Sequence, residues 1–208
     1  MKRRIQAFTL VELMVVLAVL VVLAGGAGVA LQRSDHAIAL QAGQTLLARS
    51  LASARVHATL TGRNASVAVP LDPAEPNRSL RAVGVAVRDQ AGVGWIPAGG
   101  WLTFPPGVAL VPPSAAGNTN EPAAEWADLR SSGLKEPLAV VGGVTALLLE
   151  FTPRGTVVGG GGDLVLAPCR KLPAGGEYPF VFQDPDAVRG LTVSAYGVTE
   201  WIHERAGF

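Results

Sequence analysis

Cysteine, histidine and aromatic residues are scarce in this chain of 208 residues, which contains one Cys, three His and 6% aromatic residues. The single cysteine, Cys169, excludes an intrachain disulfide, and we expect its side chain to be buried. The histidines do not stand in a spacing typical of metal ligands; they are His36, His57 and His203. The sequence therefore predicts no metal site and no cofactor.

Catalytic motifs are also missing. Gly159–Gly162 is a run of glycines, but no Gly-Lys-Ser/Thr follows it, so we predict a flexible hairpin turn there rather than a phosphate-binding loop. The serines are not organised around a nucleophile elbow. These absences predict a protein that is not an enzyme and make a membrane-anchored enzyme the least favoured hypothesis.

Positive charge is concentrated at the amino terminus. The formal net charge is +1, but Lys2, Arg3 and Arg4 belong to a short basic leader, and without that leader 14 basic residues face 16 acidic ones. Residues 62–208 carry 11 basic and 14 acidic residues, with one adjacent basic pair, Arg170-Lys171. Because binding to duplex DNA relies on clustered cations, a nucleic-acid partner is not expected.

A long apolar stretch, Phe8–Leu31, follows the leader. Its part from Leu13 to Leu31 has 19 residues without a charge or a proline, and as a helix it would span about 28 Å, close to the thickness of a bilayer core. The cationic leader predicts a cytoplasmic amino terminus, with the rest of the chain outside the cytoplasmic membrane. Glu12 lies inside this stretch, where a carboxylate costs about 2.5 to 3.5 kcal/mol unless it is neutralised.

A free amino terminus at Phe8 would neutralise Glu12. If the chain is cut between Ala7 and Phe8, Phe8 carries a charged amine that a packed copy of the same helix can present to Glu12. The run Ala7–Glu12 (AFTLVE) after a basic leader resembles the cleavage and methylation signal of type IV prepilins and type II secretion pseudopilins. In that family prepilin peptidase cuts before the Phe and methylates its amine, and the Glu pairs with a neighbour's amino terminus during assembly. Most members have Gly where this chain has Ala7.

Two simpler interpretations compete with this one. A secretory signal peptide also has a basic start and an apolar centre, but it is cut after the apolar run, and Glu12 is unusual in such a centre. An ordinary signal anchor explains the apolar run but not the FTLVEL block.

An amphipathic helix is predicted from residue 32 to residue 61. Apolar residues recur near helical spacing and predict the buried face, namely Leu31, Ile38, Leu46, Leu51, Ala54 and Ala58. Thr61-Gly62 supplies the stop, since glycine suits a helix carboxyl terminus.

Beyond Asn64 the pattern is that of strands. Ala65–Leu71 and Leu80–Arg88 are Val-rich and separated by turn residues, so they are predicted to pair in antiparallel fashion. Pro112–Pro137 is predicted to be a surface excursion with one helical turn around Ala123–Leu129. The other predicted strands are Trp101–Phe104, Val144–Phe151, Thr156–Val158, Leu164–Ala167, Leu191–Tyr196 and Thr199–His203.

The second half of the chain carries a weaker resemblance. Four motifs, in this order, are similar to the H-type minor pseudopilins of type II secretion and the related fimbrial T proteins (GspH/FimT): Leu46–Ser50 with Ala54, Ala65–Val69, Leu149–Gly155 and Val193–Thr199. The resemblance implies an α+β, pilin-like fold in which a long amino-terminal helix packs on an antiparallel β-sheet head. The predicted parts are a cleaved leader (1–7), a transmembrane helix (8–31), an amphipathic helix (32–61) and a β-rich head (62–208).

The sequence thus predicts a minor pseudopilin, a single-pass subunit anchored in the inner membrane with a periplasmic head. The resemblance implies prepilin peptidase, other major and minor pseudopilins and an inner-membrane assembly platform as partners. The alternative is a DNA-binding minor pilin for DNA uptake. DNA-binding fimbrial T proteins resemble one another in a Gly-Arg-x-Arg motif on the terminal strand, where this chain has Gly197-Val198-Thr199-Glu200.

Overall fold

The structure is a computed structural model that describes residues 10–72, 75, 77–113, 126, 129–171 and 180–208, with side chains left undescribed at 23–35, 136–138, 171 and 180. The chain divides into two structural units, Met1–Ala37 and Ile38–Phe208. One helix, α1 (Leu10–Thr61), contributes to both, and it ends where the Thr61-Gly62 stop predicts, with Gly62 at a φ of 63°.

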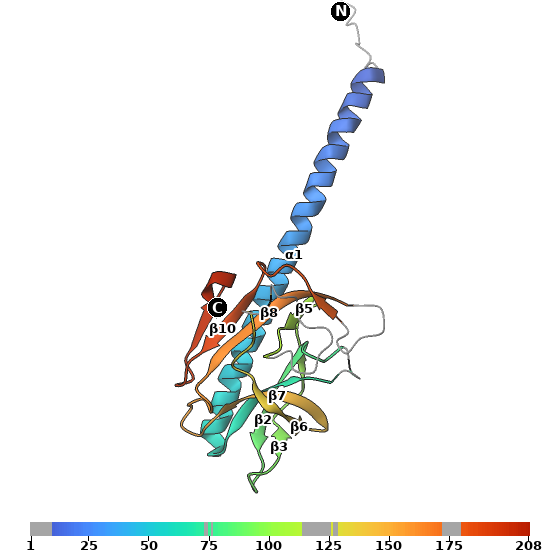
Figure 1. Ribbon diagram of the computed structural model, residues 1–208. Helices are drawn as coiled ribbons and strands as arrows, with labels where there is room; N and C mark the ends of the chain where they lie inside the picture. The colour runs from blue at the N-terminus through green and yellow to red at the C-terminus, as the bar shows by residue number, and fades with distance from the viewer. Residues whose placement is uncertain (1–9, 73–74, 76, 114–125, 127–128, 172–179) are drawn as a thin grey trace, which may run out of the picture. The chain divides into compact units, whose positions relative to one another are not determined.

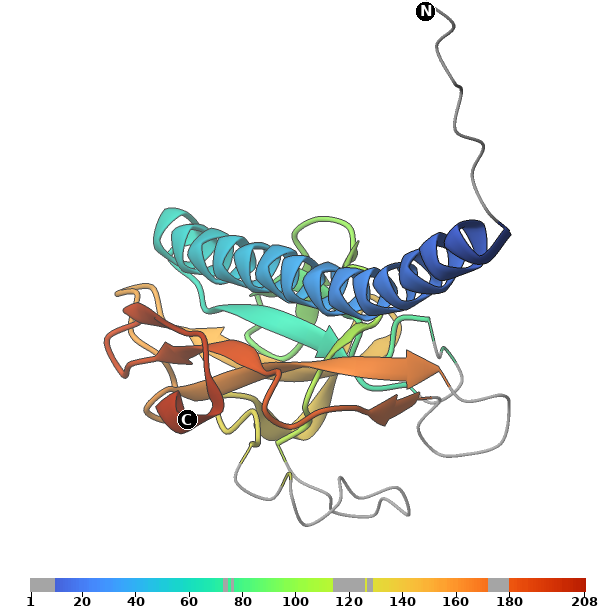
Figure 2. The ribbon, with the colours of Figure 1, turned by 90° about the horizontal axis from the view of Figure 1, so that it is seen from above.

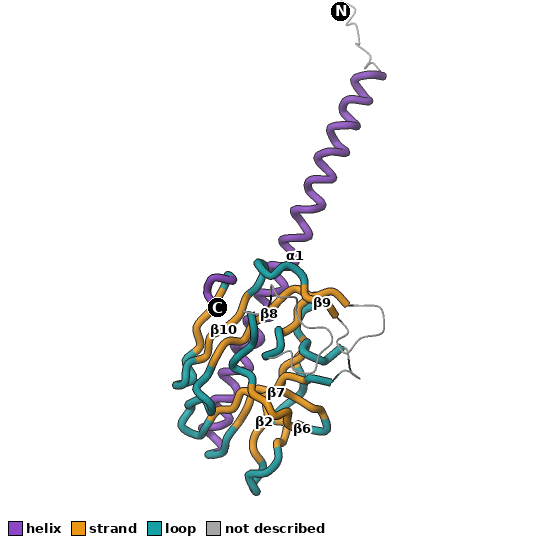
Figure 3. The backbone as a smooth tube through the Cα atoms, in the orientation of Figure 1, coloured by secondary structure: helices purple, strands orange, loops and turns teal. Residues whose placement is uncertain are grey.

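The second unit is rich in β-strands (Figures 1 and 3). The predicted α+β class is therefore confirmed. Its strands, in chain order, are β1 (Ala65–Pro70), β2 (Ala82–Arg88), β3 (Trp95–Pro97), β4 (Leu102–Thr103), β5 (Val108–Leu110), β6 (Lys135–Val141), β7 (Val144–Phe151), β8 (Gly162–Lys171), β9 (Phe180–Phe182), β10 (Arg189–Val193) and β11 (Thr199–Ile202).

Within the described residues, the strands form two sheets. The first has the order β1-β7-β6-β3-β2-β4, and β1 also pairs with β2, so five of its strands close a ring of pairings. The second has the order β11-β10-β8-β5, with β9 also paired to β8. The predicted antiparallel pairing of β1 with β2 is confirmed, with Val67 opposite Val85. The head is not purely antiparallel, however, because β3 and β6 pair in parallel at Trp95 and Val141.

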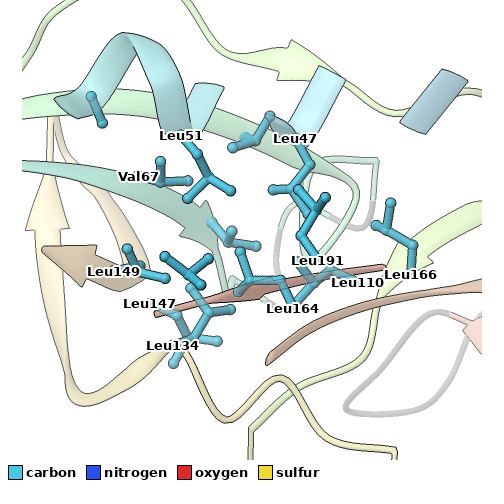
Figure 4. Packing of buried hydrophobic residues seen from close by; sticks show 14 of the residues in the cluster. Leu47, Leu51, Val67, Leu110, Leu134, Leu147, Leu149, Leu164, Leu166 and Leu191 are labelled. Carbon is cyan, nitrogen blue, oxygen red and sulfur yellow. The ribbon is translucent and has the colours of Figure 1, made fainter. Parts of the chain in front are cut away.

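The main core lies between α1 and both sheets (Figure 4). Figure 2 shows the second half of α1 lying alongside the long strands. Leu47 and Leu51 of the helix pack in one cluster with Val67, Leu149 and Leu191 from the sheets. Each such buried side chain contributes about 1.5 to 3 kcal/mol relative to an exposed one.

Side chains along a strand point alternately to its two faces. Those that point away from the main core form two smaller hydrophobic clusters. Val67 of β1 belongs to the main core, whereas its neighbour Ala68 lies in a second cluster, to which all five strands of the ring contribute residues. Val165 and Ala167 of β8 face a third cluster that contains Trp126 and Leu129. Because Trp126 and Leu129 belong to the predicted surface excursion Pro112–Pro137, their burial in this third cluster contradicts part of that prediction.

The segment Pro112–Pro137 is not wholly a surface excursion. Residues 114–125, 127 and 128 lie outside the described residues, as does most of the predicted helical turn, but Trp126 is only 4% exposed and its ring centroid lies 5.4 Å from that of Phe182. Strand β6 begins at Lys135, inside the predicted excursion, because Lys135 already pairs with Leu148 of β7. A Pro-containing strand is poorly recognised from pattern alone.

The glycine run Gly159–Gly162 is not a flexible hairpin turn. Its first three glycines end the connection from β7 to β8, and Gly162 is the first residue of β8; these two strands belong to different sheets and do not pair with each other. A Cβ atom on Gly161 would overlap the carbonyl oxygen of Val193, and one on Gly162 would lie 2.7 Å from the backbone nitrogen of Gly133. Glycine is needed there because neighbouring backbone fills the space.

Two smaller predictions also change. Ile38 is 62% exposed rather than buried, and Leu46 is half-buried. The predicted strand Leu191–Tyr196 ends at Val193, because Ser194 to Gly197 form the turn into β11.

Cys169 lies on β8 and is buried, as predicted. Desolvation raises the pKa of its thiol from the ordinary value of 9.0 to about 11, and the nearby Arg81 guanidinium opposes this rise in part. At pH 8 we therefore expect the native protein to react with an aromatic disulfide reagent roughly a hundredfold more slowly than the denatured chain, since the thiolate is the reactive form. The absorbance of the released thiol measures this rate, and Cys169→Ala sets the background. Equal rates in both states would contradict the buried thiol.

Candidate assembly site

The predicted processing and assembly residues are partly outside the described structure. Ala7 and Phe8 lie outside the described residues, whereas Glu12 is exposed and lies in the first turn of α1. A carboxylate at this position is stabilised by the positive end of the helix dipole. The same end of the helix is where a new amino terminus at Phe8 would lie in sequence.

Among the described residues, no helix combines the length and hydropathy of a membrane span.

The predicted span Phe8–Leu31 extends beyond what the structure describes. Phe8 and Thr9 lie outside the described residues, as do the side chains from Leu23 onward. From Leu10 to Val22 the apolar side chains are exposed. The transmembrane assignment remains a prediction.

The second half of α1 attaches to the sheets through one buried polar side chain. Gln44 is fully buried, and its Nε2 donates to the carbonyl oxygens of Gly190 at 2.6 Å and Ile202 at 3.0 Å. These residues are opposite each other on β10 and β11. The helix is thereby fixed to the edge of the second sheet. Sequence periodicity missed Gln44 because a polar residue does not count toward an apolar stripe.

Arg55 makes a second attachment farther along α1. Its Nη1 donates to the carbonyl oxygen of Gly197 at 3.2 Å, in the turn between β10 and β11. Gly155 also lies close to this guanidinium. A Cβ atom built on Gly155 would lie only 2.8 Å from Arg55 Nε, so a larger residue would crowd the arginine. The motifs around Gly155 and Gly197, far apart in sequence, therefore meet at the helix.

A polar cluster also lies at the carboxyl end of the helix. Asn64 Nδ2 donates to Glu150 Oε1 at 2.7 Å, and Arg88 Nε lies 3.6 Å from the same oxygen. The Arg88 guanidinium also stacks over the Trp95 ring at 4.3 Å. Arg88, Trp95 and Glu150 line an open cavity of about 440 Å³ together with Lys135. Because Glu150 accepts a hydrogen bond from Asn64 and forms an ion pair with Arg88, the cluster joins the residue before β1 to β2 and β7 rather than presenting a free acid.

The described histidines, cysteine and acids form no group of three or more that can hold a metal ion. His203 stacks with Trp201, with ring centroids 6.4 Å apart.

The residues that bear on nucleic-acid binding lie on β8, on β11 and in the turn before β11. Arg170 is on β8 and is exposed, and Lys171 ends the same strand. Gly197 has a φ of 72° in the β10–β11 turn, and Glu200 is exposed on β11. The acid thus occupies the terminal strand where the DNA-binding pattern has its second Arg.

Comparison with known proteins gives a family match and several similar solved structures. Residues 2–28 match the family model described as the prokaryotic N-terminal methylation motif. No curated protein matches the chain.

Two of the similar solved structures are of the minor pseudopilin EpsH from the type 2 (type II) secretion system of Vibrio cholerae. One has 12% identity, a TM-score of 0.43 and coverage of 79% of this chain and 96% of its own. The other has 17% identity, the same TM-score of 0.43 and coverage of 82% and 95%. A likeness at this TM-score transfers neither function nor partners.

The family match covers Lys2, Arg3 and Arg4 of the basic segment, together with Ala7, Phe8 and Glu12. The amino-terminal segment of this chain therefore matches the prokaryotic N-terminal methylation motif, and the resemblance to type IV prepilins and pseudopilins is confirmed over this segment.

Proposed function

We propose that this chain is a membrane-anchored, non-enzymatic filament subunit, a minor pseudopilin of a type II secretion pseudopilus or of a type IV pilus-like filament. The observation that carries the proposal is the methylation motif over residues 2–28, which includes a lone acid, Glu12, in the first turn of α1. A carboxylate near lipid is costly unless a positive charge neutralises it, and a processed amino terminus supplies such a charge.

The proposed sequence of events follows from these residues. The apolar segment holds the subunit in the inner membrane, with the leader in the cytoplasm and the head outside. Prepilin peptidase cuts between Ala7 and Phe8 and methylates the Phe8 amine. An assembly platform then draws the helix into a bundle, where Glu12 pairs with the amine of a neighbouring pseudopilin and selects the axial register.

Processing provides the direct test of this function. Co-expression of the full chain with a prepilin peptidase is expected to remove the seven residues before Phe8 and to leave N-methyl-Phe8, which mass spectrometry of the amino terminus detects. An inactive peptidase is the control and should leave Met1 in place. A cut after the apolar run, near Ala27 or Ala30, would instead identify a secretory signal peptide.

A further inference from the structure

The open cavity beside Arg88 and Glu150 lies where the five-strand ring of the first sheet meets the β2–β3 turn. Its lining residues come from β2, β3, β6 and β7 and from the connections next to them. Figure 1 shows these four strands side by side. Its volume of about 440 Å³ is in the range of small-molecule sites, which are common at the mouths of closed strand rings.

The charged residues of the cavity belong to the inner face of the ring. Side chains alternate along a strand, so Arg88 shares a face with Ala86, and Glu150 shares a face with Leu148. Ala86 and Leu148 are buried in the second hydrophobic cluster, as is Trp95. Trp95 is directly opposite Arg88, and residues in such a pair point to the same side of the sheet.

Lys135 adds a second cation on this face, because it pairs with Leu148 across β6 and β7. Its side chain is exposed and passes close to Gly159, where a Cβ atom would lie 3.3 Å from Lys135 Cε. The amine Nζ donates to the carbonyl oxygen of Ser132 at 2.9 Å. Because an ammonium has three N–H donors, Lys135 can also donate to a ligand.

The charge balance of the cavity favours a ligand with one negative charge. The described lining residues include two cations, Arg88 and Lys135, and one acid, Glu150. Arg88 Nε lies beside Glu150, and Nη1 donates to the carbonyl oxygen of Val93 at 3.3 Å, so other N–H groups of the five remain for a ligand. A dianion would bring its second charge against Glu150.

Apolar side chains complete the lining. Val93, Val140 and Val158 line the cavity and are 80%, 63% and 40% exposed, whereas Trp95 and Leu148 are nearly buried. Exposed apolar side chains around a few convergent polar groups are the usual composition of a small-molecule site. A ligand that covers the three valines removes apolar surface from water, which is favourable.

We propose that this cavity binds a small monocarboxylate with a compact apolar body. The carboxylate pairs with Lys135 and Arg88, and the apolar body covers Val93, Val140 and Val158. The site is additional to the proposed filament function and does not depend on it.

Ligand-observed NMR of the full chain in detergent tests the site with 3-phenylpropanoate as the probe. Saturation transfer from protein to probe is expected to titrate with a Kd of about 1 mM or tighter, the order expected for a ligand of about eleven non-hydrogen atoms. The neutral 3-phenylpropanamide has the same size and should bind about tenfold or more weakly, because it lacks the charge. Detergent without protein sets the background.

Two substitutions of one residue assign the binding to the cavity. Lys135→Glu should weaken binding of the probe by about tenfold or more, because it places a carboxylate against the carboxylate of the probe. Lys135→Arg keeps the charge and should bind within about threefold of the natural chain. Arg170→Glu makes the same change of charge at an exposed residue of β8 that does not line the cavity, and it should leave the affinity unchanged.

Four results would overturn the proposal. They are the absence of saturation transfer above the detergent background, equal affinity for the probe and its amide, equal losses for Lys135→Glu and Arg170→Glu, and tighter binding of phenyl phosphate, which carries close to two negative charges at pH 7. The amino-terminal mass of the same protein, made with the peptidase, tests the proposed function separately. If Phe8 is N-methylated and the probe does not bind, only the ligand site fails.

Discussion

Gly161→Ala is expected to lower the free energy of unfolding by about 2 to 5 kcal/mol, whereas Gly160→Ala should cost only about 1 to 2 kcal/mol. The two glycines share a left-handed backbone, with φ of 85° at Gly161 and 93° at Gly160. A Cβ on Gly160 meets nothing within 4 Å, whereas a Cβ on Gly161 would overlap the Val193 carbonyl. The difference between the variants therefore isolates the backbone contact from the conformational cost.

Denaturant unfolding of the full chain in detergent measures this difference. The intrinsic fluorescence of the four tryptophans reports the transition, and Trp126 lies in the cluster that packs on β8. Equal midpoints for the two alanine variants would show that the connection between β7 and β8 is looser than the structure describes.

Local features of the fold were predictable from sequence because neighbouring residues determine them. Gly62 ends α1 where its left-handed φ of 63° is needed, and the Val-rich runs around Val67 and Val85 pair as expected. The buried state of Cys169 followed from its isolation in the sequence. Each of these predictions depends on a short segment.

The parts that failed depend on distant segments. The run Gly159–Gly162 has the composition of a flexible turn, but β10 backbone comes close to it and makes it a packed crossing between sheets. β6 contains Pro137 and a register shift between Lys135 and Ala139, so its pattern is not that of a regular strand. Its position depends on β7 and β3, which sequence periodicity does not reveal.

The candidate site likewise has a part that was predictable from a short segment and a part that depends on distant segments. Ala7, Phe8 and Glu12 form a contiguous signal, and the methylation motif was therefore recognisable without a structure. The groove between α1 and the β10–β11 turn is lined by Val56, Phe151 and Gly197, which only the folded chain brings together. No local pattern marks Arg55 as the side chain that spans from the helix to the β10–β11 turn.

Glu12→Val is expected to insert into the membrane at least as well as the natural chain, and yet to lower incorporation into filaments by about a hundredfold. Insertion improves because a carboxylate near lipid costs about 2.5 to 3.5 kcal/mol. Assembly suffers because removing one member of a buried ion pair leaves the other charge uncompensated, at a cost of about 3 to 5 kcal/mol. Quantitative immunoblots of membrane and sheared filament fractions measure both effects.

Two further variants assign the effect to charge. Glu12→Gln keeps the size of the side chain and should be nearly as defective as Glu12→Val, whereas Leu13→Val changes an adjacent apolar residue and should assemble normally. Normal incorporation of Glu12→Gln would show that the carboxylate charge is not required.

Co-expression with the natural chain decides whether Glu12 pairs between chains. A Glu12→Val subunit retains the amine of Phe8 and can still present it to Glu12 of a natural neighbour. Pairing between chains therefore predicts that the natural chain carries the variant into filaments above the level reached by the variant alone. If Glu12 instead pairs with the Phe8 amine of its own chain, four residues earlier in sequence, the variant remains defective whatever its neighbours are.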